Sequence, residues 1–129
     1  MDTGLIVTRS ASDHVTTTGR LIEAIERRGL RIFAQIDHAA AARDVGLDLP
    51  SEQVFVFGDP RGGTPLMLDD PRVGIELPLR ILVWEDAQGT ALAYRDPREL
   101  AGHYEVAEHR PTLEAMAGLL QKLADEASG

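Results

Sequence analysis

Asp37 and His38 are the first residues in the chain whose types could do chemistry. A carboxylate beside an imidazole suits proton transfer near neutral pH, because the negative charge raises the proton affinity of histidine. The pair follows an apolar segment that reads as a strand and precedes a run of four alanines. The alternative is structural: Asp37 caps a short helix and His38 closes a turn.

A second candidate lies between Asp59 and Met67. Backbone N–H groups of Gly62, Gly63 and Thr64, with Arg61 nearby, could form a nest for an anion. Two prolines remove donors from this segment, and a rigid turn without a ligand is the alternative. Leu66 and Met67, between Pro65 and Asp69, are either a plug in the hydrophobic core or the lip of a ligand site.

Five oxygen and imidazole donors could in principle hold a metal such as zinc, manganese or iron. They are Asp37, His38, Asp59, Asp86 and His103. No pair of them has the helical spacing of a His-Glu-x-x-His site. We therefore predict no metal site, and no cofactor is specified by the sequence.

The composition narrows the function classes. The chain has 129 residues, which predicts one domain over residues 1–129. It has no cysteine, which excludes a thiolate nucleophile or an iron–sulfur cluster. The net charge of −8 argues against nucleic acid and anionic membranes as partners. No secretory signal or membrane span is recognisable, which predicts a cytoplasmic protein.

The spacing of apolar residues predicts the elements that must position these groups. Five strands are expected at residues 5–8, 30–36, 53–57, 80–85 and 90–94, the last two joined by a hairpin at 86–89. Helices are expected at 13–28, at 39–42, and after Thr112, which would cap the last one. Residues 59–65 read as a turn-rich loop, with a helical turn at 66–68. In the second strand we expect Ile32, Ala34 and Ile36 on one face.

This order predicts an α+β fold of the β-α-β(4)-α type. Hairpins force antiparallel pairing, so the sheet is expected to be curved and mostly antiparallel, with helices on one face. The other face would be apolar and open, which favours a homodimer through that face or an edge.

Five ordered blocks of residues resemble the domain of unknown function 302 family. They are Ile36-Asp37-His38-Ala39-Ala40, Val45-Gly46-Leu47, Phe57-Gly58-Asp59-Pro60, Gly63-Thr64-Pro65-Leu66-Met67 and Leu77-Pro78-Leu79 with Trp84-Glu85-Asp86. The resemblance implies a small α+β fold like the unit of the TATA-binding protein, commonly dimeric, with no established activity. It also implies asparagine near positions 59 and 96, where this chain has aspartate.

We therefore expect a small-ligand-binding or accessory homodimer, whose site is the rim where His38, the 59–64 segment and Met67 converge. The first alternative is a metal-assisted or acid–base enzyme that uses His38 with Asp37 or Asp59. The second is a protein-interaction module without a ligand.

Overall fold

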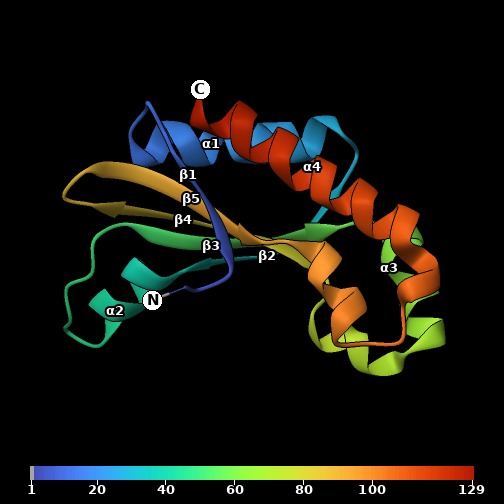
Figure 1. The fold of residues 1–129 in the computed structure, drawn as a ribbon. Helices are drawn as coiled ribbons and strands as arrows, with labels where there is room; N and C mark the ends of the chain where they lie inside the picture. The colour runs from blue at the N-terminus through green and yellow to red at the C-terminus, as the bar shows by residue number, and fades with distance from the viewer. Residues whose placement is uncertain (1) are drawn as a thin grey trace.

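A five-stranded sheet covered on one face by two long helices forms the body of the protein (Figure 1). The computed structural model describes residues 2–129. Its strands are β1 (Leu5–Arg9), β2 (Arg31–Asp37), β3 (Glu52–Gly58), β4 (Leu79–Asp86) and β5 (Gly89–Arg95). Its helices are α1 (His14–Arg27), α2 (His38–Asp44), α3 (Pro60–Asp69) and α4 (Arg110–Ser128), with 3-10 segments η1 (Pro71–Ile75), η2 (Pro97–Gly102) and η3 (Ala107–His109). The predicted α+β class is confirmed.

The strands follow the order β1-β5-β4-β3-β2, and every neighbouring pair is antiparallel. The β4–β5 hairpin closes at the predicted place, and Gly89 adopts the positive φ of 114° that favours glycine there. Because β2 and β3 run in opposite directions, their C-terminal ends lie at opposite ends of the sheet. Polar residues that follow β2 and β3 in the sequence are therefore placed at opposite ends of the sheet.

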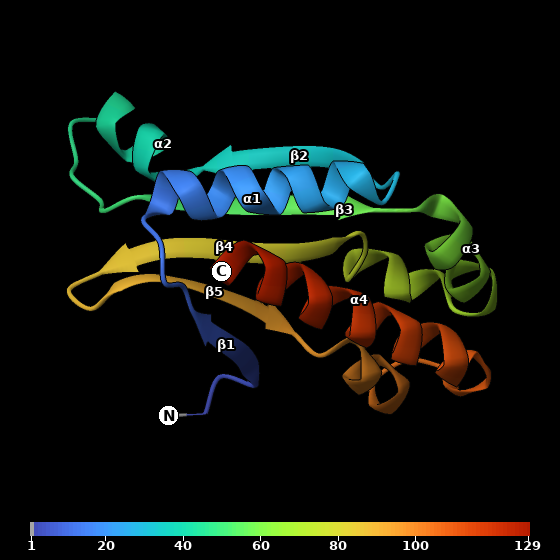
Figure 2. The same cartoon turned by 90° about the horizontal axis from the view of Figure 1, so that it is seen from above.

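Helices α1 and α4 lie side by side over one face of the sheet (Figures 1 and 2). Helix α1 begins as predicted, because the Asp13 side chain accepts the N–H of Thr16 at 2.8 Å. The predicted cap of the last helix is wrong: α4 begins at Arg110, and no side-chain hydrogen bond caps it. Pro111 occupies its first turn, where the missing N–H of proline costs nothing.

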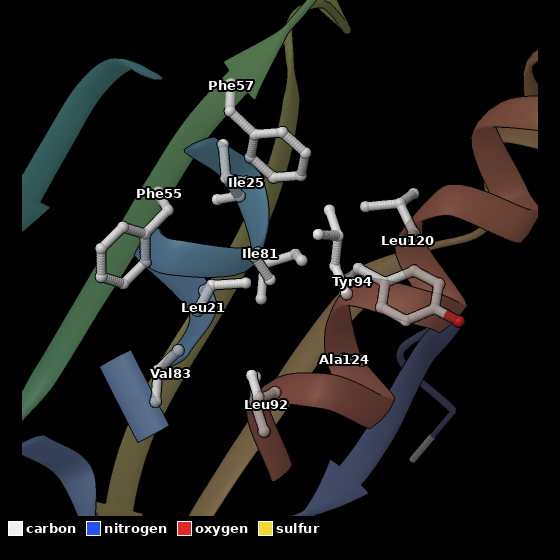
Figure 3. Close-up of a cluster of buried hydrophobic side chains, with 13 residues drawn as sticks. Leu21, Ile25, Phe55, Phe57, Ile81, Val83, Leu92, Tyr94, Leu120 and Ala124 are labelled. Carbon is white, nitrogen blue, oxygen red and sulfur yellow. The ribbon is translucent and has the colours of Figure 1, made fainter. Parts of the chain in front are cut away.

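The main core lies between these helices and the covered face of the sheet (Figure 3). Phe55 and Phe57 from β3 are fully buried against Leu21 and Ile25 from α1. Each such side chain contributes about 1.5–3 kcal/mol when removed from water.

A second, smaller core lies beyond the end of the sheet. It contains Leu66, Val73, Leu100, Val106 and Leu113, which come from α3, η1, η2, the segment before η3, and α4. This cluster attaches α3 and η1 to the N-terminal half of α4. The chain therefore has two cores, and the candidate site lies beside the smaller one.

Two further sequence predictions differ from the structure. In β2 the register shifts between Ile32 and Ala34, so Ile32 lies opposite Phe57 while Ala34 and Ile36 lie opposite Val56 and Val54. The three residues therefore do not share a face, because a bulge inserts one residue into the alternation.

The second difference is in the segment expected to be a loop. Residues 60–69 form helix α3. Pro60 fits its first turn, Asp59 caps it, and Leu66 is buried as a plug, as one of the two interpretations had it.

Candidate functional site

The structure separates the two groups of polar residues that the sequence suggested. Asp37 lies opposite Gln53 in the β2–β3 ladder, and Gly58, which precedes Asp59, lies five residues farther along β3. At about 3.4 Å per residue, that is roughly 17 Å along the strand. Figures 1 and 2 both place α2 at one end of the sheet and α3 at the other. The predicted convergence of His38 with the Asp59 segment is wrong, because it assumed that successive strand ends share a rim.

Asp37 has the structural role that the alternative interpretation gave it. Its carboxylate accepts the N–H of Ala40 at 2.8 Å and so caps α2. His38 is exposed at the start of that helix and borders a broad groove over the uncovered face of the sheet. Within residues 2–129, neither Asp37 nor any other carboxylate forms a hydrogen bond with the His38 ring.

The Asp59 segment instead borders a hollow between α3, α4 and the end of the sheet. Its volume is about 470 Å³, within the range of small-molecule sites. Five of the residues singled out in the sequence line it: Asp59, Gly62, Gly63, Thr64 and Met67. The other lining residues come mainly from β2, the segment before β4 and α4: Leu30, Phe33, Gly58, Pro60, Leu77, Pro78, Leu79, Thr112, Ala115, Met116 and Leu119.

Glycines 62 and 63 bring the α3 backbone close to the far wall of the hollow. A Cβ atom at Gly63 would lie 3.4 Å from the Leu77 side chain, and one at Gly62 would lie 3.7 Å from the methyl group of Met116. A Cβ atom at either position would make ordinary van der Waals contact with the facing side chain, so α3 packs closely against its neighbours there.

Asp59 and Arg61 form a closed ion pair at the mouth of the hollow. The carboxylate accepts the Arg61 backbone N–H at 3.0 Å, and the guanidinium Nη2 lies 2.9 Å from Oδ2. Hydrogen bonds from Arg61 lower the pKa of Asp59, so the carboxylate stays ionised at neutral pH. The N–H groups of Gly62 and Gly63 donate to the carbonyl oxygen of Asp59 at 2.9 and 3.4 Å. The predicted anion nest is therefore not formed, because those donors are already paired within the first turn of α3.

The same arrangement occurs three times, and sequence reasoning missed it. The tripeptide Asp-Pro-Arg occurs at residues 59–61, 70–72 and 96–98. In each copy the aspartate caps a helical segment and binds the backbone and the guanidinium of the arginine two residues later. Repetition of the tripeptide was the signal that could have revealed this clamp. Proline presets the first turn, and the arginine then lies next to the carboxylate.

The copy at Asp70 supports the floor beside the hollow. Asp70 is only 3% exposed, and its carboxylate binds Arg72 and the backbone N–H of Glu105. These contacts hold its pKa well below the ordinary value. The last residue of α3, Asp69, binds the ring of His109 next to the start of α4. This contact joins the end of α3 to the residue that precedes α4.

The uncovered face of the sheet carries an apolar row that crosses all five strands. Its members pair in succession: Ile36, Val54, Leu82, Ala93 and Val7. Val7 is 51% exposed and Ile36 is 45% exposed. The groove over this face has a volume of about 1010 Å³ and is also bordered by Arg80 and Glu52. Neither of those two residues forms an ion pair with another residue in the range 2–129.

Within residues 2–129, no three histidine, aspartate or glutamate side chains gather in a way that could hold a metal ion. Asp37 and His38 are neighbours at the start of α2, Asp59 precedes α3 at the other end of the sheet, and Asp86 ends β4. His103 borders the same broad groove as His38.

None of the helices in the described part of the chain combines the length and the apolar character needed to span a membrane.

Comparison with known proteins identifies the family and gives two kinds of relative. Three curated Brucella proteins are similar at 37% identity over 102 residues, or 78% of this chain. They are named fluoride-specific ion channel FluC 1 in B. suis and B. abortus and FluC 2 in B. melitensis. The chain spans 38–40% of their length.

A crystal structure titled as an uncharacterized conserved protein DUF302 from Bacillus stearothermophilus has the same fold. The TM-score is 0.85 at 16% sequence identity, and the match covers 98% of this chain and 99% of that chain. The family described as "Domain of unknown function DUF302" matches residues 6–126. The chain belongs to this family.

Proposed function

We propose that the protein is a small-ligand-binding accessory protein that acts as a homodimer. The hollow between α3 and α4 is its ligand site, and the uncovered face of the sheet is its dimer interface. The observation that carries the ligand site is the apolar lining of a hollow of about 470 Å³, bounded by Gly62 and Gly63 on one wall and Met116 on the other. Concave, mainly apolar hollows of this size are the usual form of a small-molecule site.

The accessory role is supported by the relatives. A similar segment occupies 38–40% of the proteins named as fluoride channels, whereas the Bacillus chain is matched over 99% of its length. A unit that occurs in both settings is suited to serve another protein rather than to carry the whole activity.

The homodimer is supported by the row Ile36–Val54–Leu82–Ala93–Val7. An apolar row across a whole sheet is costly to leave in water. Charges beside the row complement each other: Arg80 lies toward one end of the strands and Glu52 toward the other. A second copy rotated by 180° about the row would stack row on row and bring Arg80 over the partner's Glu52. Such an isologous contact closes after two copies.

The enzyme alternative has weaker support. His38 and Asp59 lie at opposite ends of β3, and the Asp37 carboxylate is occupied by the cap of α2. An acid–base pair needs its members within hydrogen-bond reach of one substrate.

Native mass spectrometry of freshly purified protein tests the ligand site. We expect a dimer mass with a small organic molecule that Ala115→Trp removes, because Ala115 lines the hollow. Gln121→Trp, on another side of α4 and outside the hollow, should retain it. A dimer that never carries a ligand and shows no thermal shift with a metabolite panel would favour the interaction module instead.

Charge reversal tests the dimer interface. We expect Arg80→Glu to weaken the dimer at least about tenfold in sedimentation velocity, and the double variant Arg80→Glu with Glu52→Arg to restore it. Val7→Glu should also dissociate the dimer, whereas Val15→Glu on the outer side of α1, where Val15 is 78% exposed, should not. A wild-type monomer at all concentrations contradicts this part of the proposal.

A further inference from the structure

We infer that the hollow between α3 and α4 selects an uncharged, largely apolar small molecule and disfavours anions. This inference rests on the proposed function, because it names the class of ligand for the same hollow. It is carried by the charge balance at the mouth, the chemistry of the lining and the residues that shape the walls.

The lining offers apolar contact and few polar partners. Phe33, Leu77, Leu119 and the two methionines, Met67 and Met116, are among the apolar residues that line it. Thioether side chains adapt to irregular shapes and make favourable contacts with aromatic rings. The hydroxyl groups of Thr64 and Thr112 are the polar side chains in the lining besides Asp59. A flat or compact apolar molecule with one or two hydrogen-bonding groups fits this surface.

The N-terminus of α3 is already occupied by a carboxylate, which disfavours an anionic ligand at the mouth. Asp59 is the only charged residue among those that line the hollow within residues 2–129. Its carboxylate occupies the N-terminus of α3, where an anionic ligand would otherwise bind. The pKa of Asp59 is lowered by Arg61, so this negative charge persists across the neutral range. Arg61 balances it, with the guanidinium bound to the carboxylate through Nε and Nη2.

A cationic ligand gains little binding energy from Asp59, because that carboxylate is already paired with Arg61. The two carboxylate oxygens of Asp59 already accept three hydrogen bonds from Arg61. A ligand ammonium group would have to displace the guanidinium, which is tied to the carboxylate by adjacent backbone and side-chain contacts. Burial of an unpaired charge in the apolar lining is also unfavourable. The mouth is therefore neutral overall and the interior is apolar.

Two fluorescent probes with one skeleton test the charge selection. Phenylnaphthylamine is uncharged, and anilinonaphthalenesulfonate adds a sulfonate to the same pair of rings. We expect the uncharged probe to bind at least about tenfold tighter to the wild-type protein in a fluorescence titration. Ala115→Trp should abolish that binding, and Gln121→Trp should leave it unchanged.

Asp59→Asn sharpens the test because it keeps the size and the capping oxygen but removes the charge. Arg61 is then unpaired at the mouth, so the sulfonated probe should gain about fivefold in affinity while the uncharged probe changes less than about twofold. Asp96→Asn is the matched control: it alters an identical Asp-Pro-Arg clamp that does not line the hollow. It should change neither affinity.

Three results overturn the inference. They are equal or tighter binding of the sulfonated probe to the wild type, loss of uncharged-probe binding in Gln121→Trp, and no binding of the uncharged probe at all. The proposed function fails separately, when purified protein carries no molecule of any class that Ala115→Trp removes. A co-purified anion would thus overturn the inference and retain the proposed function.

Discussion

The hollow between α3 and α4 and the uncovered face of the sheet are both apolar depressions, but they are built differently. The hollow measures about 470 Å³ and lies between α3, which carries Gly62, Gly63 and Met67, and α4, which carries Met116. The groove over the face measures about 1010 Å³, and the face itself carries a row of aliphatic residues on paired strands, flanked by Arg80 and Glu52.

The two regions also differ in whether their charged side chains are paired. The one charged group at the hollow is closed by its own arginine, whereas the charges beside the row have no partner within residues 2–129. A region with internally paired charge suits a neutral ligand. A region with open charges of both signs suits another macromolecular surface. The comparison teaches that pairing of charge, more than apolar area, distinguishes the two kinds of site.

The largest expected effect comes from removing the plug beside the hollow. Leu66 is fully buried, so Leu66→Ala should lower the free energy of unfolding by about 2–5 kcal/mol. Leu68→Ala, two residues away on the same helix and 80% exposed, should change it by less than about 0.5 kcal/mol. Urea unfolding monitored by circular dichroism measures both. A Leu66→Ala cost as small as that of Leu68→Ala would show that the second core does not support α3.

The next effect compares two copies of the Asp-Pro-Arg clamp. Asp70→Asn should lower the Tm by about 5 °C or more, because the buried carboxylate loses charge-assisted hydrogen bonds to Arg72 and Glu105. Asp59→Asn should lower it by less than about 2 °C, since the Asp59 clamp lies at the open mouth of the hollow. Differential scanning fluorimetry gives both values. Equal losses would mean that burial does not distinguish the clamps.

Acid should lower the stability of the folded protein, and part of this loss should come from Asp70. Its folded-state pKa lies below the ordinary value of an aspartate side chain, so the ionised form stabilises the folded state above that ordinary value. This contribution is lost as the pH falls below about 4 toward the folded-state pKa. We expect the Tm of the wild type to fall more steeply than that of Asp70→Asn between about pH 5 and pH 2.5. Parallel curves for the two proteins would exclude Asp70 as a source of acid sensitivity.

The smallest expected effect tests whether the hollow needs a particular side chain or only an apolar wall. Met116→Leu conserves volume and should cost less than about 1.5 kcal/mol of stability. Affinity for the uncharged probe should stay within about threefold of the wild type. Fluorescence titration measures that affinity, and its complete loss would show that the thioether itself is required.

The fold followed from local sequence signals, whereas the site required the pairing of strands. The sequence predicts the two helix caps, Asp13 and Asp37, and the turn at Gly89, because each depends only on neighbours within three residues. The separation of His38 from Asp59 depends on the antiparallel register of β2 and β3, which no short motif contains. A list of polar residues at strand ends does not state which end of the sheet each occupies.

Other errors also have local causes. The glycine and proline content of residues 60–65 favoured a loop, but Asp59 as cap and Leu66 as buried anchor hold the segment as a helix. The bulge between Ile32 and Ala34 shifts the alternation of β2 by one residue, so Ile32 and Ala34 lie on opposite faces of the sheet. Each strand contributes one residue to the apolar row, so the row can be recognised only after the strands are paired.

Amide chemical-shift mapping of the uncharged probe tests the central claim most directly. Phenylnaphthylamine is added to isotopically labelled protein, and shifts are compared between the hollow and the face. The account predicts perturbation at Gly62, Gly63 and Thr64, with little change at Ile36 and Leu82. Perturbation confined to Ile36, Leu82 and their row would contradict it, because the face and not the hollow would then be the ligand site.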